Sequence, residues 1–170
     1  MQQTIAERML AMARMLICYH SRTQHTHHLA DAVAEGARQA AGVQVDLKDV
    51  KDVEARSLVE YDAILIGSPT YYGSMAAEVK KLLDESVAIH GQLEGKVGGA
   101  FASSGNIGGG NETTVLDILK AMLIHGMVVQ GSPQGAHYGP VAIGDVDQRA
   151  RDDCRRAGRK LAELAVKLHG

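Results

Sequence analysis

Two unbroken apolar runs, each followed by a polar turn and a helix-like pattern, constrain the fold of this chain most. The runs cover residues 15–19 and 63–67 and are typical of strands that are buried on both faces of a parallel sheet. After each turn, apolar residues recur every three or four positions, from about residue 27 and from residue 79. This alternation predicts an α/β domain whose helices cover both faces of a sheet.

The rest of the chain continues the alternation. Residues 43–50 alternate apolar and polar side chains, as a half-exposed edge strand does. Two further strands are expected at residues 96–102 and 127–130, and two further helices at 113–125 and 147–168. A loop is expected at residues 131–140. Five strands alternating with helices predict a three-layer, doubly wound, five-stranded parallel sheet. A half-exposed second strand favours the flavodoxin-like strand order 2-1-3-4-5.

The length and charge of the chain limit its organisation and partners. Its 170 residues predict one domain at 15–170, after an N-terminal extension at 1–14. The net charge of -2 provides no basic field for nucleic acid or for a membrane surface, and no stretch is apolar enough to span a bilayer. Two cysteines, Cys18 and Cys154, lack a spacing motif. Two cysteines without such a motif predict a reducing, cytoplasmic setting. The absence of a long apolar stretch predicts no membrane insertion.

Three polar loops follow the first, third and fourth strands, so they are expected at one edge of the sheet, where doubly wound folds bind ligands. In the first loop, Ser21, Thr23 and Thr26 precede or begin a helix, where free backbone N–H groups and the helix dipole can hold a phosphate. The alternative is that Thr26 only caps the helix and the rest is a surface turn. The second loop carries Tyr71 and Tyr72, two of only six aromatic residues.

The third loop has glycines at 105, 108, 109 and 110. They make either a flexible turn or a slot in which a flat ring approaches the backbone closely. A phosphate cradle, a stacking aromatic side chain and a backbone-lined slot together predict a flavin mononucleotide (FMN) site. Other ligands of similar folds fit less well, because the first loop lacks both Gly-x-Gly-x-x-Gly and Gly-Lys-Ser/Thr. The strand ends also lack the acidic cluster of a response-regulator receiver.

Several motifs carry a family resemblance. Ser21-x-Thr23-x-x-Thr26 resembles the phosphate loop of flavodoxins, although Gln24 stands where flavodoxins usually have Gly. Residues 67–75 are similar to the flavin-stacking loop of the WrbA-like NAD(P)H:quinone oxidoreductases. Further matches to that family are residues 103–104, 108–113, 125–127, 138–139 and 164–168. Residues 86–96 lack the aromatic that this family places before its fourth strand, and the family's tetramer-building insertions are reduced.

The resemblance implies an enzyme that transfers a hydride from NAD(P)H to FMN and then two electrons to a quinone. It implies that His125 lies over the flavin as the catalytic candidate, in a homo-oligomer that is a dimer or a tetramer. No metal is implied. The cofactor-binding candidates fall in the three loops and one later segment: Ser21, Arg22, Thr23, Gln24, His25, Thr26, Pro69, Thr70, Tyr71, Tyr72, Gly73, Ser103, Ser104, Gly105, Asn106, Ile107, Gly108, Gly109 and Tyr138.

Some alternatives stay open at this point. The protein can instead be a flavodoxin-type one-electron carrier that docks on redox partners, although such carriers are usually more acidic. A flavin-sensing module without turnover is a third possibility. His20, His25, His27 and His28 either bind a metal or line the phosphate loop. His125 can also have a purely structural role, because a histidine in the last turn of a helix interacts favourably with the helix dipole.

Overall fold

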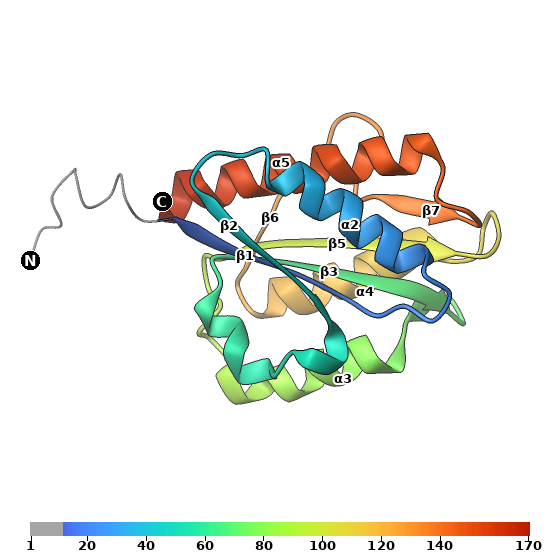
Figure 1. Cartoon of the computed structure of the whole chain (residues 1–170). Coiled ribbons are helices and arrows are strands. Elements are labelled where there is room, and N and C mark those ends of the chain that lie inside the picture. The colour runs from blue at the N-terminus through green and yellow to red at the C-terminus, as the bar shows by residue number, and fades with distance from the viewer. Residues whose placement is uncertain (1–11) are drawn as a thin grey trace, which may run out of the picture.

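The sheet has the predicted flavodoxin-like order. The structure is a computed structural model that describes residues 12–170. Its strands run in the order β2-β1-β3-β5-β6, and the short strands β4 and β7 pair with β3 and β5 respectively (Figure 1). All pairings are parallel except β3 with β4. The strand bounds are β1 Ala13–Tyr19, β2 Val43–Asp49, β3 Ala63–Tyr71, β4 Ser74–Met75, β5 Val97–Ser104, β6 Val128–Val129 and β7 Val141–Ile143.

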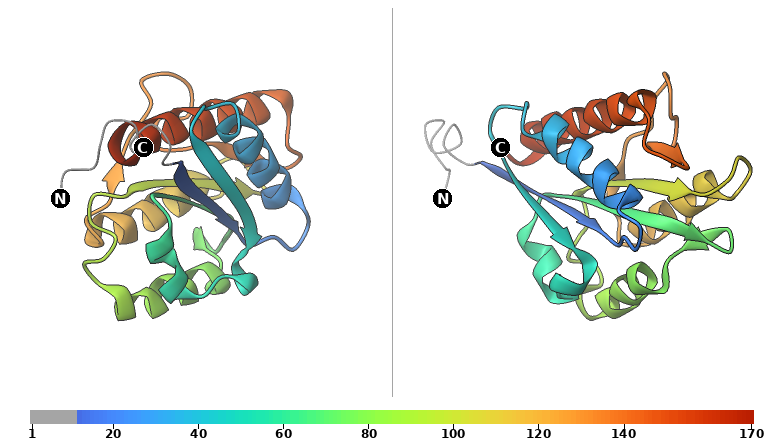
Figure 2. Two further views of the ribbon diagram at one scale, coloured as in Figure 1. Left: turned by 60° about the vertical axis from the view of Figure 1, so that its left-hand side comes forward. Right: turned by 45° about the vertical axis from the view of Figure 1, so that its right-hand side comes forward.

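Helices cover both faces of the sheet, as the predicted three-layer arrangement requires. Helices α2 and α5 lie side by side on one face, and α3 and α4 lie on the other (Figure 1, Figure 2). Their bounds are α2 His25–Ala37, α3 Ala77–Glu85, α4 Asn111–Ile124 and α5 Gln148–His169, with short 3-10 turns η1 Val50–Asp52, η2 Ala55–Glu60 and η3 Ser86–Ile89. No helix among residues 12–170 is long and apolar enough to cross a membrane.

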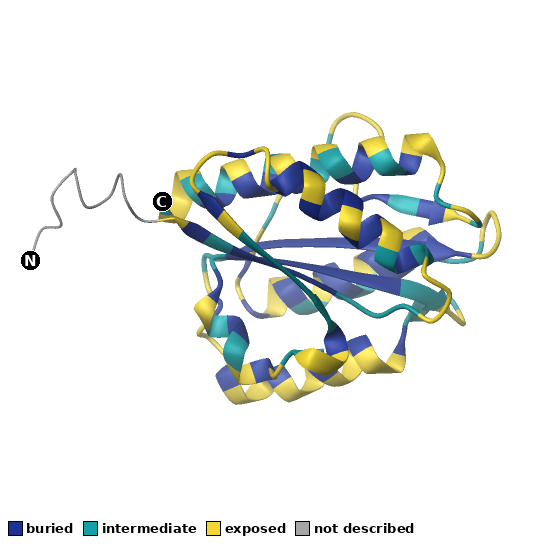
Figure 3. Ribbon diagram, in the orientation of Figure 1, coloured by how far each residue is buried: buried dark blue, intermediate teal, exposed yellow. Residues whose placement is uncertain are grey.

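The central strands are buried on both faces, which explains their unbroken apolar sequences. Met15 and Ile17 of β1 pack beneath α2 and α5, whereas Leu16 and Cys18 pack with α3 and α4. Successive side chains of a strand point to opposite faces, so one run supplies both halves of the core. The buried strands between two half-exposed helical layers are visible in Figure 3.

Helices α2 and α5 touch through their backbones. A Cβ atom at Gly158 of α5 would overlap the carbonyl oxygen of Val33 in α2. A Cβ atom at Gly36 of α2 would likewise overlap the carbonyl oxygen of Arg155 in α5. Because both positions lack side chains, the two helices approach more closely than larger residues would permit.

The sheet differs from the sequence prediction at its fifth position. The strand predicted at 127–130 is confirmed as β6, which is shorter and covers only Val128–Val129; an additional strand that was not predicted, β7, follows the 130–140 loop. Both strands pair with β5, at opposite ends of it. Pro133 has no N–H to offer a sheet, and the same stretch contains Gly131, Gly135 and Gly139, so the chain leaves the sheet between β6 and β7. The 103–104 pair, predicted as loop, completes β5, and β3 extends beyond residue 67 into a hairpin with β4.

Candidate functional site

The first loop, residues 20–26 (loop 1), joins β1 to α2 with a left-handed residue. Gln24 is the N-cap of α2 and has φ 68°, a conformation that glycine adopts without strain. Its side chain makes no capping bond to the backbone but reaches His27, with 2.8 Å between Gln24 Oε1 and His27 Nδ1. This left-handed conformation explains why a glycine would suit the position, and this chain has a strained glutamine there instead.

The three hydroxyls of loop 1 are placed differently. Ser21 Oγ is buried and has no hydrogen-bond partner among residues 12–170, so it could donate to an anion. Thr26 Oγ1 is also buried but lies 2.8 Å from Ser103 Oγ at the end of β5. Thr23 is exposed. Thr26 thus ties loop 1 to the third loop, and Ser21 has the freer hydroxyl for a phosphate.

The histidines around loop 1 face separate carboxylates. His20 Nε2 lies 3.6 Å from Glu78, and His25 Nε2 lies 3.7 Å from Asp145. His27 stacks on Tyr19 with ring centroids 4.9 Å apart. Within residues 12–170, no three histidine, cysteine or acidic side chains gather around a point where a metal ion could bind. The arrangement fits the interpretation in which these histidines line the loop.

The second loop, residues 67–75 (loop 2), presents its tyrosines at the same edge. Tyr71 is 37 % exposed, and Tyr72, with φ 49°, projects fully into solvent from the turn between β3 and β4. The hairpin is anchored on α4, because Ser74 Oγ donates to Asp117 at 2.6 Å. Hydrogen bonds from Lys120 and Ser74 lower the pKa of Asp117, so this anchor stays ionised at neutral pH.

The third loop, residues 103–112 (loop 3), contacts loop 2 directly and leaves open space beside its glycines. Thr113 Oγ1, just after the loop, donates to the carbonyl oxygen of Gly73 at 2.8 Å, and a Cβ atom on Gly110 would lie 2.7 Å from Gly73 Cα. In contrast, a Cβ atom on Gly73, Gly105 or Gly108 would meet nothing within 4 Å. A planar ring could therefore approach the backbone of both loops, as the slot hypothesis requires.

The structure accordingly brings the three predicted loops together. Loop 1 meets loop 3 through Thr26 and Ser103, and it meets loop 2 where the Arg22 guanidinium lies 6.0 Å from the centre of the Tyr71 ring. Thr114 Oγ1 donates to Thr70 Oγ1 at 3.0 Å, which joins α4 to loop 2. These contacts, the orphaned Ser21 hydroxyl and the open glycine backbones fit a ligand with a phosphate and a flat ring.

His125 is not part of this cluster. It caps the far end of α4, a 14-residue helix that spans about 21 Å at 1.5 Å per residue, and loop 3 lies at the other end. His125 Nε2 is 2.7 Å from Ser86 Oγ, while its Nδ1 atom is buried without a partner in residues 12–170. Burial and the neighbouring His90 lower the pKa of His125. It lines a groove of about 760 Å³ between α3 and α4 that also includes Val87 and Ile124 and two residues of loop 2, Ser74 and Met75.

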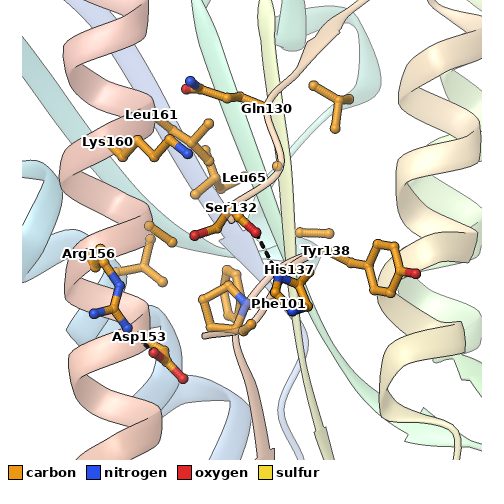
Figure 4. A pocket seen from close by; sticks show the side chains of 18 of the residues that line it. Leu65, Phe101, Gln130, Ser132, His137, Tyr138, Asp153, Arg156, Lys160 and Leu161 are labelled. Carbon is orange, nitrogen blue, oxygen red and sulfur yellow. Dashed lines mark hydrogen bonds and ion pairs between the residues drawn. The ribbon is translucent and has the colours of Figure 1, made fainter. Parts of the chain in front are cut away.

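Tyr138 lies at the margin of the cluster, on the 130–140 loop. It is 52 % exposed and borders a hollow with Glu112 and Val115 of α4, close to the end of loop 3. Figure 4 shows its ring turned away from α5, on the far side of a pocket beneath the loop. Lys160 fastens the loop to α5 by donating to the carbonyl oxygen of Gly131 at 2.7 Å.

The sequence analysis did not assign Asp145 to the site, because its place beside other charged residues indicated a helix start; in the structure Asp145 faces His25 at the edge of the sheet. The signal was present in the apolar stretch Val141–Ile143, which forms β7 parallel to β5. A strand assigned there would have placed the following residues at the same carboxyl edge as the three loops.

Comparisons with known proteins agree with this geometry. A family model described as a flavodoxin domain matches residues 16–115. A flavodoxin from Aquifex aeolicus is 36% identical over 94% of this chain and 91% of its own length. An NAD(P)H dehydrogenase (quinone) from Chromohalobacter salexigens is also 36% identical, over 94% of this chain and 100% of its own length. Among solved structures, the flavodoxin, WrbA-like protein from Agrobacterium tumefaciens is 28% identical, covers 93% of this chain and 99% of that chain, and has a TM-score of 0.78.

Proposed function

Because this chain belongs to the flavodoxin-domain family, we propose that it binds FMN and transfers electrons from NAD(P)H to a quinone or a similar small acceptor. The observation that carries the proposal is the convergence of three loops around open glycine backbones and an unpartnered buried hydroxyl, Ser21 Oγ. Relatives named NAD(P)H dehydrogenase (quinone) match nearly the whole chain, which supports an enzymatic role.

Each loop has a distinct part in this proposal. Loop 1 would hold the phosphate with the first N–H groups of α2 and the Ser21 hydroxyl. The backbones of residues 70–72 and 104–109 would enclose the ring, and N–H groups there would favour negative charge on it. When bound, FMN supplies the two-electron redox chemistry, whereas the protein positions the ring and tunes its electronics. No side chain near the ring is proposed as an essential acid or base.

The rival proposal is a one-electron carrier. The relative from Aquifex aeolicus named flavodoxin favours it. The charge balance opposes it, because 18 basic residues against 20 acidic ones provide only a weak field for steering toward a basic partner. The two candidates differ in whether NAD(P)H alone reduces the bound flavin.

For His125, we infer that contact with a flavin requires a second copy of the chain. The length of α4 separates His125 from loop 3 of its own chain by about 21 Å. The groove around it is flanked by Val87 and Ile124, each 73% exposed, and such apolar exposure is typical of an interface. Val87→Lys is therefore expected to lower the mass measured by light scattering and to slow quinone reduction by the loaded protein. A wild-type monomer with full quinone activity would contradict this role.

The first experiment is anaerobic. The purified protein is loaded with FMN and mixed with NADH and separately with NADPH while the flavin absorbance is followed. The oxidoreductase predicts rapid bleaching that benzoquinone reverses. A flavin that stays oxidised with both nucleotides would favour the carrier, and failure to retain FMN would refute the site.

A second experiment tests loop 1 without turnover. Ser21→Ala should weaken FMN affinity about tenfold, because a hydrogen bond to a charged group is lost, and should leave riboflavin affinity unchanged. Ser57→Ala, in which the lost hydroxyl donates to the carbonyl oxygen of Glu54 in a remote turn, is the matched control. Equal losses for FMN and riboflavin would indicate a structural effect.

A further inference from the structure

Arg22 is the only permanently charged cation in the three loops that make up the site. Loops 1, 2 and 3 contain no other arginine and no lysine. Among residues 12–170, the ion pairs of loop 1 join His20 to Glu78 and His25 to Asp145, and none includes Arg22. A single exposed guanidinium without a carboxylate partner is available to bind an anion.

The guanidinium of Arg22 lies beside loop 2, which carries Tyr71. Its Cζ atom lies 6.0 Å from the centre of the Tyr71 ring, which is 37 % exposed. The cradle already has the N-terminus of α2 and the buried Ser21 hydroxyl as donors. Helix N-termini bind phosphate without a cation, so the FMN phosphate does not require Arg22.

The second anion that must come to this site is the electron donor. NADH and NADPH both carry a diphosphate one ribose away from the nicotinamide, and the nicotinamide must reach the flavin ring. An arginine offers planar, paired donors that match phosphate oxygens. Resting on the proposed function, we propose that Arg22 binds the diphosphate of the nicotinamide donor while the nicotinamide lies against the flavin.

The location of Arg22 also determines which phosphate it serves. The additional 2′-phosphate of NADPH is carried by the adenosine ribose, on the other side of the diphosphate from the nicotinamide. An arginine beside loop 2 therefore serves NADH and NADPH alike, and it contributes to the binding of the donor rather than to the choice between the two.

The test compares Arg22→Gln with Arg56→Gln in FMN-loaded protein. Arg56 is exposed in η2, before β3 and away from the loops, so its replacement makes the same charge change at a remote place. For Arg22→Gln, the KM for both NADH and NADPH should rise about tenfold, equivalent to about 1.4 kcal/mol. The kcat and the KM for benzoquinone should stay within twofold of wild type. The KM values of Arg22→Lys for NADH and NADPH should lie between those of wild type and Arg22→Gln, because lysine keeps the charge but loses the paired donors.

A binding measurement separates this role from effects on turnover. NAD+ and NADP+ are titrated into the oxidised, FMN-loaded proteins, and binding is followed by calorimetry. Both affinities should fall about tenfold in Arg22→Gln and should be unchanged in Arg56→Gln. The loss should shrink as sodium chloride is raised, because salt screens an exposed charge.

The remaining outcomes would overturn the proposal. Unchanged KM values and dinucleotide affinities would show that Arg22 does not touch the donor. A loss confined to NADPH and NADP+ would assign Arg22 to the 2′-phosphate, and a weaker affinity for FMN but not for riboflavin would assign it to the cofactor. A wild-type protein that binds no flavin would refute the proposed function and this inference together, whereas the other outcomes leave the proposed function intact.

Discussion

Replacing Gln24 tests whether loop 1 is held in a strained conformation. The residue has φ 68°, where a Cβ atom raises the energy by about 1–2 kcal/mol relative to the right-handed region. The informative comparison is Gln24→Ala against Gln24→Gly, because both variants lose the bond to His27 and only one keeps a Cβ atom. Glycine also loses about 0.4–1 kcal/mol more conformational entropy on folding than alanine does.

At the middle of both ranges, the relief of strain exceeds the cost in entropy. The glycine variant should therefore be more stable than the alanine variant by about 0.8 kcal/mol, or about 2–3 °C in Tm for a domain of this size. Against wild type, the glycine variant should be nearly neutral, since loss of the exposed bond to His27 removes only about 0.5 kcal/mol. Urea titrations of the flavin-free protein measure both differences.

A control compares alanine with glycine at a position that has ordinary right-handed helical backbone. Lys81 is exposed in the middle of α3, so Lys81→Ala should be about 1 kcal/mol more stable than Lys81→Gly. If alanine were as stable as glycine at position 24, or more stable, the left-handed strain assigned to Gln24 would be refuted.

Three further predictions follow from buried groups. Burial raises the pKa of both Cys18 and Cys154 to about 12. A thiol reagent at pH 8 should therefore label neither cysteine in the folded protein but both cysteines in guanidinium chloride, and rapid labelling of the folded protein would contradict this. Gly158→Ala should lower the free energy of unfolding by about 2–3 kcal/mol through its overlap with α2, whereas the neighbouring exposed Arg159→Ala should change it by less than about 0.5 kcal/mol. Burial lowers the pKa of His125, so the unfolded chain binds more protons than the folded one, and the free energy of unfolding falls as pH drops below about 6.5. Urea titrations between pH 7 and pH 5 should show a smaller fall for His125→Gln. An equal fall in the variant and in wild type would contradict this.

The sheet order could be predicted because its central strands are buried on both faces. Residues 63–67, for example, have no polar side chain, and only a strand covered by helices on both sides can use such a run. The edge beyond β5 was predicted only in part, as one strand instead of two. There β6 and β7 each pair over only two or three residues, too short for a periodic pattern to be recognised.

The candidate site was predictable as loops but not as individual contacts. The positions of Ser21 and the loop glycines follow from the chain order of strands and helices. The bond between Thr26 and Ser103 joins residues 77 positions apart, and nothing local in the sequence indicates it. The separation of His125 from loop 3 follows from the length and direction of α4, which a motif comparison does not take into account.

The close backbone packing of α2 on α5 has a consequence for the order of events during synthesis. Loop 1 leads into α2, and one flank of α2 is covered by a helix that begins only at Gln148. A ribosome must therefore add more than 100 residues after Ala37 before this flank of α2 is covered. We expect the nascent chain to hold the proposed cofactor only once α5 has emerged, so that FMN is acquired after translation of the domain rather than during it.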